Sequence, residues 1–171
     1  MDYILAPKDK DSGARPGCIF CNFPGAAREH HRENLVLVAN DDYSVMLNRY
    51  PFAAGHLLVV PRKHVGHLAD LSELEVDMLF RAVRTVGDRM RKSIQPHGVN
   101  YGINEGSAAG AGIAEHLHVH LVPRWNGDTN FMPVVADVRV MPEHLDATYA
   151  RIYESVSDLP GAAPRPREHA K

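Results

Sequence analysis

The sequence has little net charge and no long hydrophobic run, and both absences narrow the possible functions. A formal net charge of −2 at pH 7 gives no general attraction to nucleic acid or anionic membranes, so DNA is not an expected partner. No apolar stretch approaches the length of a membrane span, and the first residues do not form a signal-like segment. We therefore expect a cytoplasmic protein without membrane association.

Cysteine is scarce, and the two cysteines present, Cys18 and Cys21, form a C-x-x-C pair. In a reducing compartment such a pair is more typical of metal or redox chemistry than of a structural disulfide. Two distant histidines would complete a tetrahedral zinc site, and His64 and His116 are candidates, although the histidine pair 30–31 lies nearer in sequence. The alternative is that both cysteines are reduced core residues.

The length of 171 residues, with 44% hydrophobic and 23% charged residues, suits one domain with a substantial core. Residues 1–16 carry prolines and a glycine among charges, so we expect an extended N-terminal arm. The proline-rich residues 160–171 are expected to form a disordered tail. The domain should therefore span residues 17–159, and no internal repeat is present.

Apolar runs bounded by turn residues predict an antiparallel meander followed by a long helix. The helix is predicted over residues 71–94, because apolar residues recur at helical spacing, Ser72 can cap its start and Pro96 ends it. Its other face is charged, so the helix should lie on a sheet. A second helix is expected over 142–157, after strand-like material in 132–140. The expected strands cover residues 35–38, 43–48, 56–60, 98–104 and 116–122.

The last of these strands, His116-Leu-His-Val-His-Leu-Val122, has histidines at a spacing of two with apolar residues between them. Alternate side chains of a strand share a face, so the imidazoles would line one face while the apolar residues anchor the other. A neutral imidazole with its second nitrogen held by an acceptor is a competent nucleophile toward phosphorus, and the central His118 is best placed for this role. His120 could hydrogen-bond a phosphoryl oxygen. The alternatives are a solvated face of histidines and a three-histidine zinc site of a metal hydrolase.

A glycine-rich loop comes directly before these histidines. Gly110 and Gly112, with Ser107, allow the backbone to approach an anionic ligand closely, and Asn104 should reach the mouth of the loop. Next to a row of histidines such a loop indicates phosphate binding, whereas alone it could equally be a flexible surface loop. Trp125, the only tryptophan, could stack on a base or belong to a core or interface.

These features resemble the histidine triad (HIT) nucleotide-binding family, whose signature is three histidines alternating with apolar residues and ending in two more apolar positions. Residues 116–122 fit every position. The cysteine pair and the segment 48–65, NRYPFAAGHLLVVPRKHV, are similar to the family's early C-x-x-C and central hairpin. Within the family, the segment 123–132 looks most like the bacterial branch related to diadenosine tetraphosphate phosphorylases and hydrolases.

The resemblance implies an α+β fold, with a five-stranded antiparallel sheet, a long helix and a C-terminal helix, usually as a homodimer. It implies that His118 is the nucleotidylated nucleophile and that His120 assists at the α-phosphate, with no metal required for catalysis. Asn48 would meet the ribose, and Asn104 with the loop 107–112 would bind phosphates. The structural zinc of some members implies four ligands here: Cys18, Cys21, His64 and His116.

The substrate implied by the resemblance is an adenine nucleotide or a dinucleoside polyphosphate, cleaved at the α-phosphate through a covalent His118–nucleotide intermediate. The acceptor could be water or phosphate. Many members carry glutamine and then Ser or Thr where this chain has Gly112-Ile113, so no side-chain proton donor for the leaving group is identified. The alternatives are a nucleoside phosphoramidase and a regulatory module with negligible turnover, and the intact triad favours an enzyme.

Overall fold

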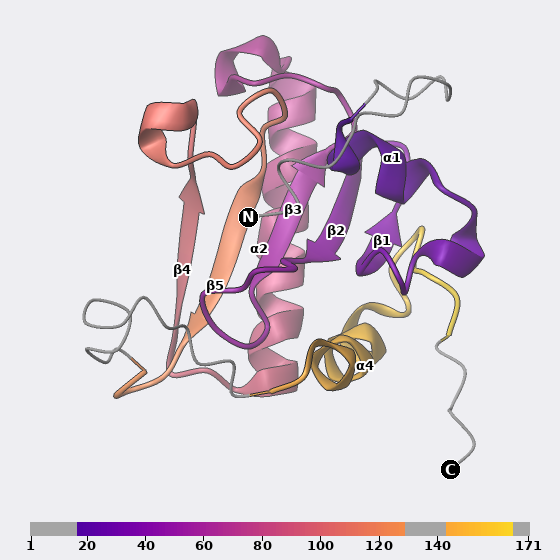
Figure 1. Ribbon diagram of the computed structural model, residues 1–171, viewed down its shortest axis with the longest axis vertical. Helices are drawn as coiled ribbons and strands as arrows, with labels where there is room; N and C mark the ends of the chain where they lie inside the picture. Colours follow the sequence, from indigo (N-terminus) through magenta and orange to yellow (C-terminus); the bar gives the residue numbers. More distant parts are fainter. Residues whose placement is uncertain (1–16, 129–142, 166–171) are drawn as a thin grey trace.

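The computed structural model describes residues 17–128 and 143–165, which form an antiparallel sheet with helices packed on it (Figure 1). The strand order is β1-β2-β3-β5-β4, and all neighbouring strands pair antiparallel. This arrangement confirms the α+β fold class with five antiparallel strands. The strands are β1 (Val36–Ala39), β2 (Tyr43–Leu47), β3 (Leu57–Pro61), β4 (Gly98–Ile103) and β5 (Val119–Arg124).

The long helix α2 (Glu73–Ile94) is capped at both ends. Ser72 Oγ accepts a hydrogen bond from the Glu75 N–H, and the Glu75 carboxylate accepts one from the Ser72 N–H, which completes a capping box. Gln95 takes a left-handed conformation just before Pro96, so the expected start and stop are confirmed. No helix in the described parts of the chain is long and apolar enough to cross a membrane. The other α-helices within residues 17–128 and 143–165 are α1 (Ile19–Gly25) and α4 (Leu145–Val156).

Two apolar cores lie on opposite faces of the sheet, because strand side chains alternate. The main core packs β-strand residues against α2 and α4, where Val86, Met90 and Tyr149 are fully buried. The smaller core packs Phe20 of α1, with Cys18 just before it, onto the other face. Because of this second core, the C-x-x-C segment lies directly on the sheet. The strand residues of the smaller core are Val36, Met46, Leu58 and Val60.

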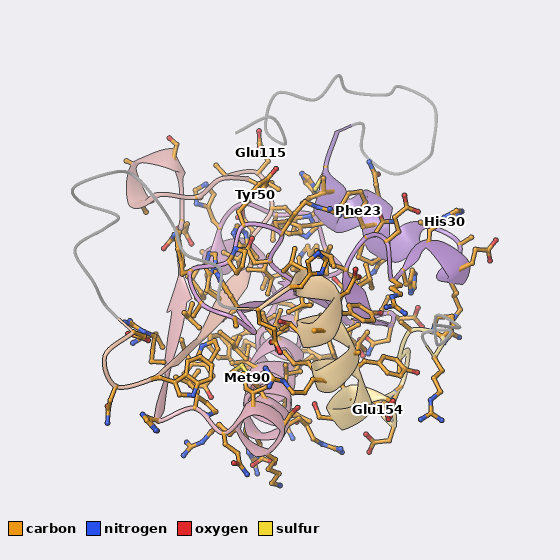
Figure 2. All side chains as sticks on the ribbon, turned by 60° about the horizontal axis from the view of Figure 1, so that its bottom comes forward. Phe23, His30, Tyr50, Met90, Glu115 and Glu154 are labelled. Carbon is orange, nitrogen blue, oxygen red and sulfur yellow. The ribbon has the colours of Figure 1, made fainter. Side chains whose placement is uncertain are left out.

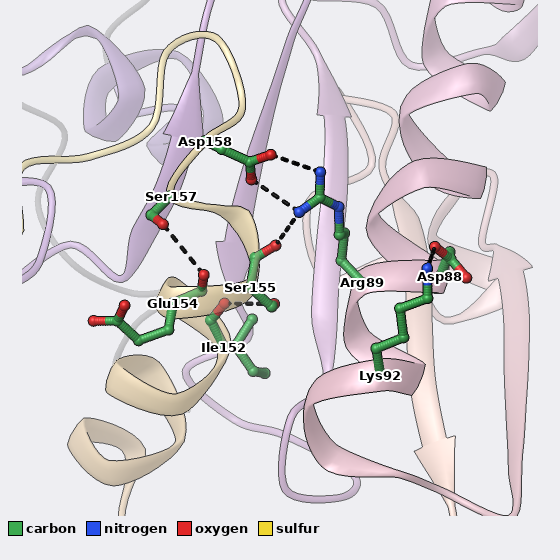
Figure 3. A network of polar contacts seen from close by, with 8 residues as sticks. All are labelled: Asp88, Arg89, Lys92, Ile152, Glu154, Ser155, Ser157 and Asp158. Carbon is green, nitrogen blue, oxygen red and sulfur yellow. Dashed lines mark hydrogen bonds and ion pairs between the residues drawn. The ribbon is translucent and has the colours of Figure 1, made fainter.

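Helix α4 is tied to both α2 and the sheet by polar contacts. Arg89 on α2 donates to the two carboxylate oxygens of Asp158, at 2.9 and 2.7 Å, and to the Ser155 carbonyl (Figure 3). Tyr149 on α4 donates its hydroxyl hydrogen to the Val36 carbonyl of β1 at 2.7 Å. Because the ion pair is exposed, it contributes little to stability and acts chiefly to orient the helix.

Residues 160–165 pack against the sheet, which corrects the prediction of a disordered tail from residue 160. The Ala39 N–H donates to the Gly161 carbonyl and the Ala163 N–H donates to the Leu37 carbonyl, both at 2.8 Å. Tyr153 donates to the Ala163 carbonyl at 3.0 Å. These hydrogen bonds to β1 and α4 hold the segment despite its prolines. The expected arm (1–16), the strand-like segment (132–140) and residues 166–171 lie outside the described residues.

Candidate functional site

The three imidazoles of the triad lie at and just before the start of β5. The strand begins at Val119, not at His116 as expected, because the N–H of Leu117 bonds to the loop after β3 and not to a neighbouring strand. The predicted alternation holds, since Leu117 and Val119 enter the main core while Phe20 contacts the rings of His116 and His118. A solvated histidine face is wrong, because His116 and His118 are 0% and 5% exposed.

His118 is held as a neutral imidazole with its lone pair on Nε2. Its Nδ1 lies 2.9 Å from the backbone carbonyl of His116. A carbonyl only accepts, so Nδ1 carries the proton and Nε2 is left unprotonated. Burial lowers the pKa of His118 below its usual value, which favours this neutral form. His118 therefore has the tautomer that the nucleophile hypothesis requires.

His120 has the opposite tautomer, which is set by a fourth histidine, His56. The Phe52 N–H donates to His56 Nδ1 at 3.2 Å, so the proton of neutral His56 is on Nε2. That Nε2 lies 2.9 Å from His120 Nδ1, which must accept and leaves the His120 proton on Nε2. His120 Nε2 is buried and has no hydrogen-bond partner among the described residues, so it can donate to a bound phosphoryl oxygen.

Burial keeps both histidines of this pair neutral. It lowers the pKa of His56 to about 3, with the nearby His120 and His118 adding to the effect. The pKa of His120 falls to about 4, first through burial and then through His118. Sequence analysis did not identify His56 as a site residue. It stands before the apolar run of β3, and the register that brings it to His120 involves two distant strands.

Acidification is expected to destabilise the fold through His56. Its pKa in the folded state, about 3, lies below the unfolded value of 6.5, so the unfolded chain binds more protons between these values. The stabilisation is complete above pH 6.5 and is lost as the pH falls, by at most about 1.4 kcal/mol per pH unit. Urea denaturation at several pH values should show a shallower loss in His56→Asn than in the wild type. Equal slopes would contradict a neutral buried His56.

A pocket of about 950 Å³ opens beside His118 and His120. The predicted binding residues Asn48, Asn104, Gly110 and Gly112 all line it, as do both of these histidines. Asn104 Nδ2 lies 3.5 Å from the Gly110 carbonyl, at the limit of a hydrogen bond, and Gly110 has a φ of 90° that favours glycine. The loop backbone therefore forms one wall of the pocket next to the histidines.

Apolar side chains from α1 and the sheet form the other wall of the pocket. Phe23 and Tyr50, which both line it, lie in the upper part of Figure 2, well away from Met90 of the main core. The cavity thus combines an apolar wall with a few polar groups, as small-molecule sites commonly do. The apolar residues of this wall include Ile19, Phe20 and Phe23 of α1, Leu35 just before β1, and Met46 and Leu58 of the sheet.

Two predicted binding residues, Ser107 and Trp125, do not line the pocket. Trp125 follows the far end of β5 and packs against the main core. Trp125 is five positions after His120, a distance of about 17 Å along an extended strand. Ser107 lies in an exposed 3-10 turn, η3 (Ser107–Ala109), within the loop. The pocket lining therefore gives no support to base stacking by Trp125 or ligand binding by Ser107, and both stay predictions.

The four predicted metal ligands come together in one cluster: their donor atoms lie within 4.8 Å of one another. Cys18 Sγ is 3.3 Å from His116 Nδ1, and Cys21 Sγ is 3.2 Å from His64 Nδ1. His116 Nε2 lies 2.9 Å from the Pro61 carbonyl and donates to it, which directs the Nδ1 lone pair at the sulfurs. Two thiolates and two neutral imidazoles are the donor set of a structural zinc site.

This geometry also bears on the alternative metal sites predicted for the histidines. His30 and His31 are not in the cluster, and of the triad histidines only His116 belongs to it. A metal clamp of three histidines is therefore not formed, since His118 bonds to the backbone and His120 bonds to His56. The two cysteines pack with the smaller core and also place their sulfurs beside the histidine nitrogens of the cluster.

Comparison with known proteins gives the same assignment. Residues 29–127 match the family model of the HIT domain. The chain is 39% identical over 151 residues to the AP-4-A phosphorylase of Mycobacterium tuberculosis, covering 86% of this chain and 76% of that protein. It is 33% identical over 109 residues to the asymmetrical bis(5'-nucleosyl)-tetraphosphatase of Schizosaccharomyces pombe, covering 64% of this chain and 56% of that enzyme.

Solved structures of similar fold include a zinc-bound histidine triad family protein from Mycobacterium smegmatis. It matches with a TM-score of 0.64 and 26% identity over 83% of this chain and 94% of that one. A hypothetical histidine triad nucleotide-binding protein from Sulfolobus tokodaii matches with a TM-score of 0.63 and 25% identity, covering 83% and 93% of the two chains. From the triad geometry, the family match and these relatives, the chain belongs to the histidine triad (HIT) family.

Proposed function

We propose that this chain cleaves the α-phosphate bond of dinucleoside polyphosphates of the diadenosine tetraphosphate type. The observation that carries the proposal is the neutral His118, whose Nδ1 is held by a carbonyl while the ring lines a nucleotide-sized pocket. Relatives named as a phosphorylase, a tetraphosphatase and a bis(5'-adenosyl)-triphosphatase support the same substrate class. Asn48 is proposed to meet the ribose, and Asn104 with the glycine loop to meet the phosphates.

In the first step, the Nε2 lone pair of His118 attacks the α-phosphorus, and the bond from that phosphorus to the bridging oxygen breaks. The leaving polyphosphate takes the electron pair of that bond. For diadenosine tetraphosphate the products of this step are adenylylated His118 and ATP. The His120 Nε2–H donates to a phosphoryl oxygen and stabilises its negative charge.

In the second step, an oxygen of water or inorganic phosphate attacks the same phosphorus, and the bond to His118 Nε2 breaks. The electron pair returns to the imidazole, while the proton of the attacking group passes to solvent or a nearby base. Water gives AMP, and phosphate gives ADP. His118 thus serves as a covalent catalyst and needs no metal at phosphorus.

The sequence departure at Gly112-Ile113 favours a phosphoanhydride over a phosphoramidate. Both residues line the pocket, and neither has a side chain that can donate a proton. An amine leaving group must be protonated as the phosphorus–nitrogen bond breaks, whereas a polyphosphate can leave as an anion. We therefore treat a nucleoside phosphoramidase as the second candidate function.

Product analysis tests the proposed function. The protein is incubated with diadenosine tetraphosphate with and without inorganic phosphate, and nucleotides are identified by mass spectrometry. AMP with ATP indicates hydrolysis, and ADP with ATP that appears only with phosphate indicates phosphorolysis. Binding without either product pair would leave a regulatory module as the better account.

We propose that the metal cluster holds a structural zinc ion. Its ligands would join α1 and the loop after β3 to the start of β5: Cys18, Cys21, His64 and His116. When bound, zinc would supply a fixed tetrahedral link between these segments and no chemistry at phosphorus. The zinc-bound relative from Mycobacterium smegmatis supports this assignment. A cytoplasmic location, where the thiols stay reduced, remains a prediction.

We also propose a homodimer that pairs the face made by β4 and α2. β4 is an edge strand whose residues are mostly exposed, and Tyr101 on it is 49% exposed. Phe80 on α2 is 44% exposed. An edge strand with free backbone groups is a ready site for pairing with another chain.

Light scattering at micromolar concentration is expected to give the mass of two chains. Tyr101→Lys should shift the protein toward the monomer, because it places a charge on the paired face. The matched control Tyr50→Lys lies outside β4 and α2 and should leave the mass unchanged. A wild-type monomer at every concentration would contradict the dimer.

A further inference from the structure

Two exposed aromatic side chains, Tyr50 and Phe52, lie at the mouth of the pocket. They line the same cavity as His118 and His120, yet they are 49% and 62% exposed. Other large exposed apolar side chains among the described residues, such as Leu74, lie on α2 or β4. Large exposed apolar groups that are gathered at a cavity commonly mark a binding surface.

Each of these aromatic residues is anchored through its backbone to a polar side chain of the site. The Tyr50 N–H donates to Asn48 Oδ1 at 2.9 Å, and the Phe52 N–H donates to His56 Nδ1 at 3.2 Å. The Phe52 ring also stacks on His56, with ring centroids 5.1 Å apart and an interplanar angle of 20°. Pro51 between them restricts the backbone. The backbone at both positions and the ring of Phe52 are therefore held in place before any ligand binds.

The apolar lining of the pocket has a buried part and an exposed part, which matches a substrate with two bases. In the buried part, Leu35, Met46 and Leu58 are 3–6% exposed. This part suits the base of the nucleotide that is transferred to His118. The base on the leaving side must lie outside it, and the exposed aromatic residues provide the flat apolar surface there.

We propose that Tyr50 and Phe52 bind the base of the leaving nucleoside and make the chain prefer dinucleoside polyphosphates over nucleoside polyphosphates that end in a bare phosphate. This inference rests on the proposed function. Every base has a π-face on which an aromatic side chain can stack, so any base should be accepted at the leaving position. A substrate carrying guanine on the leaving side should be bound about as well as diadenosine tetraphosphate.

The test compares diadenosine tetraphosphate with adenosine 5'-tetraphosphate, which has the same phosphate chain but no second nucleoside. We expect the ratio of their kcat/KM values to fall about tenfold in the double variant Tyr50→Ala/Phe52→Ala, which corresponds to about 1.4 kcal/mol. The matched variants Tyr50→Phe and Phe52→Tyr keep the rings and should keep the ratio. An unchanged ratio in the alanine variant would overturn the proposal, as would an equal loss of affinity for AMP.

Binding measurements separate this inference from the proposed function. Calorimetry in the His118→Ala background gives the ratio of dissociation constants for the same two ligands without turnover. The alanine substitutions should lower the preference for the dinucleotide about tenfold there as well. If the wild type turns over neither substrate, only the proposed enzymatic function is refuted. If Tyr50→Ala/Phe52→Ala leaves the preference for the dinucleotide unchanged, only the proposed base binding by the two aromatic residues is refuted.

Discussion

His118→Ala is expected to abolish turnover of diadenosine polyphosphates, with a loss of at least about 10⁴-fold, while nucleotide affinity changes by less than about tenfold, or 1.4 kcal/mol. In the proposed mechanism, His118 makes its largest contribution as a bond to phosphorus in the transition state. In the same mechanism, ground-state affinity depends instead on Asn48, the glycine loop and the apolar wall, which line the pocket. Rate and affinity should therefore separate, as measured by steady-state kinetics and by calorimetry with AMP.

His30→Ala is the matched control, because His30 is exposed and lies outside the pocket and the metal cluster. It should retain both turnover and affinity. A metal hydrolase would behave differently, since brief chelation would stop the wild-type enzyme while the fold persisted. That result, or full activity in His118→Ala, would refute the nucleophile.

Combined substitution of Cys18→Ser and Cys21→Ser is expected to remove about one zinc ion per chain together with much of the thermal stability. The free energy of binding a structural zinc, of order 10 kcal/mol, is linked to folding. We expect the melting temperature to fall by roughly 10 °C or more. Metal analysis and differential scanning calorimetry on freshly purified, reduced protein without a tag measure both effects.

His30→Ala is again the control, because this histidine was a candidate ligand from sequence spacing and the structure places it outside the cluster. It should keep its zinc and its melting temperature. If the wild-type protein prepared in this way holds no zinc, Cys18 and Cys21 stabilise the fold only by packing in the smaller core.

Features that depend on local periodicity could be predicted from the sequence. The helix α2, with its cap at Ser72, follows from helical spacing and cap chemistry, and the alternation around His118 follows from the strand period. That Cys18, Cys21, His64 and His116 form one metal site was predicted with the help of the family resemblance, and the structure brings the four residues together.

Features that depend on distant pairing could not be predicted in the same way. The contact of His56 with His120 requires the register of β3 against β5, which no local pattern specifies. The packing of residues 160–165 depends on hydrogen bonds to β1, which outweigh a composition typical of disorder. The position of Trp125 outside the pocket lining could not be predicted either, because residues close in sequence to the triad lie far from it along an extended strand.

The proposed function depends above all on the covalent His118–nucleotide intermediate. The most direct test is to quench the wild-type reaction with diadenosine tetraphosphate rapidly and without acid, and then to analyse its peptides by mass spectrometry. The account predicts an adenylyl group attached to the peptide that contains His118, formed at a rate no slower than turnover and absent from His118→Ala. Turnover with no nucleotide on this peptide at any time point, or with the group on another residue, would contradict it.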